Sequence, residues 1–260
     1  GLFYRHWNQW RSSDRRHIFV MSFAGGQAWD ITPGDFDSPT LTLGSGRDFA
    51  FSPDGNEIAF VRNTDSAAAL STNNDIFIVP SKGGTIRRIT SNAGNDNHPV
   101  YSPDGRYIAY RSMRRPGFEA DQYDLMLFDR RKRSPEEPDR NLTGEFDLDV
   151  DEIVWAPDGE TLYFTAGDLG RQAIFLCQLK GNRIRHILHT GCNSRLSAGP
   201  EGDALHFLRT RINLPDEIFS CDTRGENEIQ TTFINQALIE QIEMNAVEDF
   251  WYPSFDARLV

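Results

Sequence analysis

The sequence contains little cysteine. Its three cysteines, Cys177, Cys192 and Cys221, lie far apart and form no C-x-x-C pair. A disulfide framework or a cysteine-ligated metal site requires more cysteines, or more closely spaced ones. We therefore expect free or buried thiols. Long apolar runs are missing too, since no stretch approaches the roughly 18 to 20 residues of a membrane span.

An excess of positive charge is also absent. The chain carries 27 lysines and arginines against 38 aspartates and glutamates, a net charge of −11. Nucleic acids and anionic membrane surfaces attract basic proteins. The charge balance therefore argues against a nucleic-acid or membrane partner. The hydrophobic content of 38% suffices for a substantial core in a globular protein.

Helical periodicity is the third absence. No long amphipathic helical run appears before residue 233. A solenoid of alternating strands and helices would need such a run between its strands, so this architecture is excluded. Residues 235–243 are the one stretch that is ambiguous between helix and extended chain. The sequence therefore predicts an all-β fold.

A repeated turn motif takes the place of these missing features. An aromatic residue, Ser or Ala, Pro-Asp-Gly and alternating apolar residues occur in order at 51–60, 101–110 and 155–164. Proline presets the first turn position, aspartate tolerates the second, and glycine accepts the positive φ that closes a hairpin. Each copy predicts strand, turn, strand. The turn residues, which we assign to the scaffold, are Pro53, Asp54, Gly55, Pro103, Asp104, Gly105, Pro157, Asp158 and Gly159.

The spacing of these turns predicts the architecture. With a degenerate fourth copy at Pro200, a unit of four short strands recurs every 40 to 55 residues or so, which is typical of β-propeller blades. A β-sandwich would lack the regular repeat. We predict four-stranded antiparallel blades, about five of them, in an incomplete ring. The expected blades are 1–47 (partial), 48–98, 99–151, 152–195 and 196–247.

The last residues depart from this pattern. Residues 248–252 alternate like a strand and a turn follows at Pro253. This stretch does not fit the blade template, so we expect residues 248–260 to begin another domain. The chain starts at Gly1 instead of Met, and we expect it to be part of a longer protein.

The F-S-P-D-G-x-x-I-A-F repeat resembles the propeller repeats of TolB-like proteins and of prolyl-oligopeptidase-type (S9) serine peptidases. Residues 113–121 (M-R-R-P-G-F-E-A-D), 232–238 and 247–256 (V-E-D-F-W-Y-P-S-F-D) look like the acylaminoacyl-peptidase and dipeptidyl-peptidase V branch. Residues 4–7 (Y-R-H-W) are similar to a segment in the middle of those propellers. The resemblance covers nearly the whole chain.

This resemblance implies that catalysis lies in an α/β-hydrolase domain after the propeller, with its nucleophile in a G-x-S-x-G elbow. No such motif occurs in these 260 residues. We therefore expect no catalytic residues here and no activity of this chain alone. The implied role is to gate and orient peptide substrates for the absent domain of a serine exopeptidase.

Four residues are candidates for contacting the peptide: Arg5, Trp7, Glu119 and Asp121. Charged groups can pair with a peptide terminus, and aromatic rings can hold apolar side chains. The structural alternative is that Trp7 lies in a blade core and that the charged residues brace loops. For the whole chain, a TolB-like protein-binding module is the alternative function, and a propeller glycosidase is a third reading. The resemblance favours an exported or periplasmic protein, with the compartment left open.

We predict no cofactor and no metal, although two patterns invite one. Asp147, Asp149 and Asp151 alternate, but they lack the glycine turn and distal glutamate of a calcium loop and suit the wet face of a strand. His186 and His189 form a close pair, but the sequence offers no third zinc ligand beside them. We further expect self-association, because an open propeller exposes blade faces.

Overall fold

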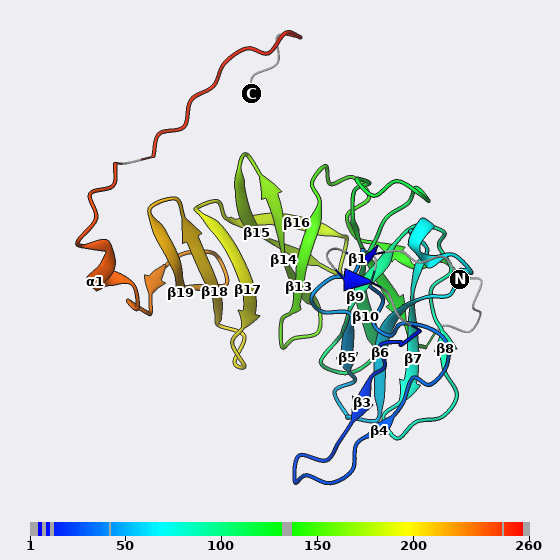
Figure 1. Cartoon of the computed structure of the whole chain (residues 1–260). Coiled ribbons are helices and arrows are strands. Elements are labelled where there is room, and N and C mark those ends of the chain that lie inside the picture. The colour runs from blue at the N-terminus through cyan, green and yellow to red at the C-terminus, as the bar shows by residue number, and fades with distance from the viewer. Residues whose placement is uncertain are drawn as a thin grey trace.

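The computed structural model describes residues 5–6, 9–10, 13–41, 43–131, 137–245 and 247–256, and nearly all of its regular structure is β (Figure 1). Sheets of four antiparallel strands follow one another along the chain, as the repeat predicts. Their strands are β5 (Phe49–Phe51), β6 (Glu57–Asn63), β7 (Asn74–Pro80), β8 (Arg87–Arg88), β9 (Asp96–Tyr101), β10 (Tyr107–Ser112), β11 (Asp124–Asp129), β12 (Arg140–Asn141), β13 (Val150–Trp155), β14 (Thr161–Asp168), β15 (Arg171–Gln178), β16 (Arg183–Leu188), β17 (Cys192–Ala198), β18 (Ala204–Arg211), β19 (Leu214–Asp222) and β20 (Ile229–Gln230).

Shorter elements precede and follow these sheets. A single parallel bridge between Gln172 and Cys192 joins the β13–β16 and β17–β20 sheets. The remaining elements are the pairs β1 (Arg5–His6) with β2 (Gln9–Trp10) and β3 (Phe19–Val20) with β4 (Trp29–Asp30), the 3-10 turn η1 (Ala68–Leu70) and the helix α1 (Gln236–Ile239). The α1 turn resolves the ambiguity of residues 235–243. No helix in the described part of the chain is long and apolar enough to cross a membrane.

The three Pro-Asp-Gly turns close the β5–β6, β9–β10 and β13–β14 hairpins. Gly105 has φ 67° and donates its N–H to the Ser102 carbonyl at 2.8 Å. The Ser102 hydroxyl donates to Asp104 at 2.6 Å and accepts the Tyr107 N–H at 2.9 Å. The Ser102 hydroxyl and then the Arg106 N–H, which both donate to the Asp104 carboxylate, lower the pKa of Asp104. These bonds lie within the turn itself and hold its backbone.

The third turn has lost the serine but keeps its hydrogen bonds by another route. Ala156 stands where the other turns have serine. The Thr161 hydroxyl donates to Asp158 at 2.9 Å, and the Thr161 N–H donates to the same carboxylate at 2.9 Å. A hydroxyl on the far strand thus replaces the one before the turn, and Gly159 keeps its positive φ of 66°.

The core lies between the sheets. Ile58 and Phe60 of β6 pack with Ile18 and Ile31, whereas the alternate residues of β6 pack toward the β9–β12 sheet. Because side chains alternate across a strand, the central strands of an array must be apolar on both faces. This packing explains the continuous apolar runs that follow each turn. It also accounts for the free, buried thiols of Cys177 and Cys221, while the third free cysteine is exposed.

The antiparallel registers give the array two distinct ends. The Pro-Asp-Gly turns and the third-to-fourth strand turns lie at one end, which we call the turn end. The second-to-third strand loops and the connections between sheets lie at the other, which we call the loop end. The tail after β20 runs to the loop end, because Asp249 pairs there with Arg171 in the β14–β15 hairpin (Figure 1). Residues 247–256 contain no strand, so the strand predicted at 248–252 is wrong.

Candidate functional site

The four predicted peptide-contacting residues are placed unequally. Trp7 lies outside the described residues, and only the backbone of Arg5, in β1, is described. Glu119 and Asp121 lie in the long β10–β11 loop at the loop end. The structure therefore brings Glu119 and Asp121 into one loop, and the roles of Arg5 and Trp7 stay predictions.

Asp121 braces this loop. It is buried and accepts the N–H groups of Arg114 and Arg115 at 2.9 and 2.8 Å, and the Arg115 Nε at 2.6 Å. Burial by itself would raise the pKa of Asp121, but the hydrogen bonds from Arg115 and Arg114 lower it below the usual range. The carboxylate therefore stays ionised and holds the loop. This arrangement matches the alternative interpretation of Asp121, in which the charged residue braces a loop.

Glu119 occupies a different position in the same loop. Its side chain is exposed, and it has no ion pair within the described part of the chain. Nearby, the Arg115 guanidinium lies 4.1 Å from the centre of the half-exposed Phe118 ring. The Gly117 N–H donates to the Thr72 hydroxyl, in the β6–β7 loop of the neighbouring sheet, at 2.8 Å. The backbone of the loop is thus anchored, while Glu119, Phe118 and Arg115 face solvent.

A pocket of about 480 Å³ opens at the foot of this loop. Both charge signs line it, so it suits a ligand with separated positive and negative groups. Arg114 pairs with the buried Asp124 at 2.7 Å. The lining residues are Arg114, Arg115, Asp121, Gln122, Asp124, Gly144, Glu145, Phe146 and Asp147.

A polar network lies beside this pocket, where the first strands of neighbouring sheets begin. The Arg111 guanidinium donates to Asn97 at 2.9 Å, pairs with Asp151 of the next sheet at 3.0 Å and lies 4.3 Å from the Tyr123 ring centre. The Tyr123 hydroxyl accepts the amides of Asn95 and Asn97. Arg111 is buried, whereas Asp151 is half exposed. We call these five residues the axial network.

Carboxylates five residues before the turn prolines connect successive sheets. Asp48 accepts the N–H of His98, which holds the same position in the next sheet, at 3.3 Å. Glu152 accepts the N–H of Leu196 at 2.9 Å and approaches Arg47 at 3.7 Å. Because a carboxylate can accept several N–H groups, it satisfies backbone donors where adjacent first strands diverge.

His98 is not a pH switch in the physiological range. Burial lowers its pKa to about 3, assisted by the positive charges of Arg111 and Arg47. The imidazole therefore stays neutral near pH 7. A general base needs a pKa near the working pH and access to a substrate, and buried His98 has neither.

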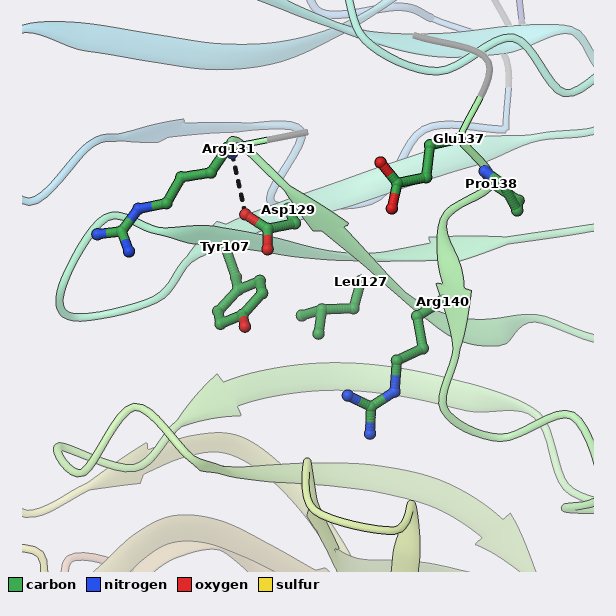
Figure 2. Close-up of a pocket in the computed structure, with 7 residues that line it drawn as sticks. All are labelled: Tyr107, Leu127, Asp129, Arg131, Glu137, Pro138 and Arg140. Atoms are coloured by element: carbon green, nitrogen blue, oxygen red, sulfur yellow. Dashed lines mark hydrogen bonds between the residues drawn. The ribbon is translucent and has the colours of Figure 1, made fainter. Parts of the chain in front are cut away.

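The pocket drawn in Figure 2 has a different character. It measures about 350 Å³ and lies beside the β13–β16 sheet, toward the turn end. Tyr107, Leu127 and Arg140 point into it, and Asp129 accepts the Arg131 N–H at 2.9 Å (Figure 2). Arg140 also bonds to Asn182 of the next sheet. Its cation therefore links two sheets and is poorly placed to bind a ligand.

Sequence reasoning missed the axial network. One signal was present: Arg111 follows Tyr110 where the equivalent copy has Val61 after Phe60, so a charge interrupts an apolar run. The alternating aspartates place its partner Asp151 on the wet face of a strand, and this residue is exposed. The pairing between them could not be predicted, because it depends on how one sheet packs against the next.

Comparison with known proteins identifies relatives of this architecture. No protein-family model matches the sequence. Dipeptidyl-peptidase 5 of Porphyromonas gingivalis is 31% identical over 264 residues, an alignment that covers 98% of this chain and 37% of that protein. The chain therefore spans little more than a third of this curated relative.

Solved structures share the fold. Acylaminoacyl peptidase of Pyrococcus horikoshii superposes with a TM-score of 0.66 at 15% identity, covering 92% of this chain and 34% of that one. A protein assigned to TolB from Agrobacterium tumefaciens gives a TM-score of 0.64 at 21% identity, covering 85% and 74%. The predicted all-β propeller fold of four-stranded blades is confirmed, as is the resemblance. The chain is a propeller-like region homologous to part of dipeptidyl-peptidase 5, of the S9 family of serine peptidases.

Proposed function

We propose that this chain is the non-catalytic propeller portion of a serine exopeptidase, of dipeptidyl or acylaminoacyl type, and that it gates and orients peptides for a catalytic domain. The observation that carries the proposal is the meeting of the tail and the irregular charged loops at one end of the array. The similarity to dipeptidyl-peptidase 5 supports peptides as the substrate class.

The loop end suits a peptide terminus. Arg115 and Glu119 face solvent above a pocket lined by both charge signs. A short peptide carries an ammonium group at one end and a carboxylate at the other, and each can form a charge-assisted hydrogen bond. Phe118 adds an exposed ring for an apolar side chain. The repetitive Pro-Asp-Gly turns lie at the opposite end of the array.

In this proposal the residues of the loop end position the substrate. The axial network connects the first strands of adjacent sheets, so its rigidity would hold the pocket in a fixed place relative to the tail. Binding energy from parts of a substrate that do not react can be used to orient the reacting bond. In this proposal the propeller contributes to KM and to length preference, and the hydrolase domain contributes the chemistry.

The test uses the full-length protein that contains this chain. We expect it to release dipeptides or acylated residues from fluorogenic peptides. Glu119→Ala should raise KM by about two- to tenfold with little change in kcat, because a partly exposed charged contact contributes roughly 0.5–1.5 kcal/mol. Glu201→Ala, at the turn end, is the matched control and should leave KM unchanged. Absence of peptidase activity, or identical kinetics of both variants, contradicts the proposal.

A TolB-like protein-binding module is the second candidate. The chain covers 74% of the Agrobacterium protein but only 34% of the Pyrococcus peptidase, so the propeller could also serve without a hydrolase. Propellers host enzymes and binding proteins alike. A full-length protein without peptidase activity that captures one partner in defined stoichiometry would favour this second function.

A further inference from the structure

Three potential metal ligands meet at the loop end of the β13–β16 sheet. Asp168 is the last residue of β14, His186 lies in β16, and His189 follows that strand. One ligand atom from each lies within 4.8 Å of the other two. The histidine pair visible in the sequence thus gains a third ligand from a strand two positions away in the sheet.

An irregularity in β16 directs both histidines to one side. Residues three apart on a regular strand point to opposite faces of the sheet. Here the register shifts, because Phe175 pairs with His186 while Ile174 pairs with Leu188, which leaves one extra residue between them. Such a bulge reverses the alternation beyond it. The two imidazole rings accordingly lie with their centroids 3.3 Å apart.

The sheet places the carboxylate on the same face. Asp168 lies four residues after Phe164 on β14, so both side chains point to the same face of the sheet. On that face Phe164 is opposite Phe175 of β15, and Phe175 is opposite His186 of β16. On this face β15 presents Arg171 opposite Asp168, then the small side chain of Ala173, and then Phe175 opposite His186. The Phe175 ring lies 4.5 Å from the His186 ring and fixes its orientation. A short side chain in the middle strand therefore leaves room for ligands to converge across it.

His186 has an unused donor or acceptor at this place. Its Nε2 is shielded from solvent and has no hydrogen-bond partner in the described part of the chain. A buried polar atom without a partner is unusual and calls for a ligand, an ion or water.

We propose that Asp168, His186 and His189 form a zinc-binding site that leaves one coordination position open. Two imidazole nitrogens and one carboxylate oxygen match the ligands of three-residue zinc sites, in which water takes the fourth position. Metal–ligand distances of about 2.0–2.2 Å require ligand atoms closer together than 4.8 Å. His189 is exposed and follows the last residue of β16, so in this proposal its side chain turns to close that distance. Imidazole ligands favour Zn²⁺ over Mg²⁺ or Ca²⁺.

The position connects this site with the tail. Asp168 and Arg171 lie opposite each other in the register of the β14–β15 hairpin. Arg171 forms the ion pair with Asp249 of the tail. Zinc would tie the same hairpin to the end of β16. The inference does not depend on peptidase activity, since it concerns the side chains of this chain alone.

The test is a zinc titration of the chelator-treated, dialysed chain by isothermal calorimetry with zinc chloride. We expect one Zn²⁺ per chain. His189→Ala and Asp168→Asn should each weaken the affinity by at least about tenfold, the scale seen when metal sites lose even supporting groups. His206→Ala, an exposed histidine on β18, is the control and should keep wild-type affinity. Magnesium chloride should give no binding heat.

A second readout separates loss of zinc from loss of the fold. Zinc should raise the thermal midpoint of the wild-type chain and of His206→Ala, but not that of His189→Ala, because only a ligand that binds the folded state stabilises it. His189 is exposed, so its replacement should leave the zinc-free midpoint unchanged. No zinc binding by the wild type, or equal weakening by His206→Ala, would overturn the assignment.

Discussion

Ile174 and Ile218 occupy equivalent places in two neighbouring sheets but different environments. Each lies in the third strand of its sheet. Ile174 is opposite Thr165 and Ile218 is opposite Leu208, and each of these partners lies six residues after the glycine of the turn between the first two strands. Ile174 is fully buried against the β17–β20 sheet, whereas Ile218 is 39% exposed. The strands are alike, so the difference arises from the neighbouring sheet.

The comparison shows where the stability of this repeat lies. A sheet in the middle of the array buries both faces, and its central strands are almost wholly buried. The β17–β20 sheet buries one face, and Ile229 on β20 is 62% exposed. In such arrays the interfaces between units contribute much of the stability, as nearest-neighbour terms. The following predictions test this difference.

The largest effect should come from truncating the two isoleucines. Ile174→Ala should lower the free energy of unfolding by about 2–5 kcal/mol, because it leaves a cavity between two sheets. Ile218→Ala should cost less than about 1 kcal/mol, since water already reaches that side chain. Urea unfolding followed by circular dichroism measures both. Equal costs would mean that the open face is covered in solution.

Asp96 should show the next effect, and it depends on pH. Burial raises its pKa to about 7, whereas the ordinary pKa of an aspartate, as in the unfolded chain, is 3.8. The folded state therefore binds the proton more tightly, so stability falls as the pH rises from about 4 to 7. Asn193 holds the equivalent place in the β17–β20 sheet, seven residues before the turn proline. Asp96→Asn should stabilise the protein at pH 8 by up to about 4 kcal/mol.

The pH profile provides the control for that prediction. Near pH 3.5 the wild-type carboxyl is largely protonated in both states, so Asp96→Asn should have little effect on the free energy of unfolding. A stabilisation that is equal at pH 3.5 and pH 8 would show that the gain arises from packing and not from the buried charge.

Self-association should follow from the open face. We expect the chain to form dimers at high concentration through the face that carries Leu208, Ile218 and Ile229, because exposed apolar side chains are buried on association. Light scattering should give a larger mass for the wild type than for Ile218→Glu. A monodisperse wild-type monomer across the concentration range contradicts the prediction.

The smallest effect should lie in the turns. Ser102→Ala removes a buried hydroxyl that bonds to Asp104 and to the Tyr107 N–H, and should cost about 1 kcal/mol. The β17–β18 turn has Gly199 and Glu201 at the corresponding places, and Glu201→Ala should change stability by less than about 0.5 kcal/mol. Thermal unfolding of both variants tests the difference. A neutral Ser102→Ala would show that proline and glycine alone determine the turn.

Local features of the fold could be predicted, and contacts between sheets could not. The hairpins at Pro53, Pro103 and Pro157 depend on three adjacent residues, so each copy predicts its own turn. The strand expected at 248–252 is wrong, because alternation indicates a strand only when a partner strand is present. The sequence also could not show that Thr161 replaces the missing serine, since the substitute lies across the turn.

The candidate site follows the same rule. Glu119 and Asp121 could be assigned to one loop, but only the structure shows that Asp121 is bound by the backbone of that loop. Arg111 and Asp151 are forty residues apart and meet through sheet packing. The convergence of Asp168 with His189 depends on a bulge, which shifts the strand register without leaving a clear mark in the composition.

Glu217 has a mechanical consequence. This buried residue of β19 accepts the N–H groups of Ile234 and Asn235, where the chain leaves the sheet. A force pulling on the tail would therefore reach β19 directly, one strand inward from the two-residue strand β20. A force that peels β20 from the sheet breaks its hydrogen bonds one at a time. A force applied to β19 instead strains several of its interstrand hydrogen bonds at once. Motion of a body attached to the tail would thus be transmitted to the sheet before the edge strand could detach.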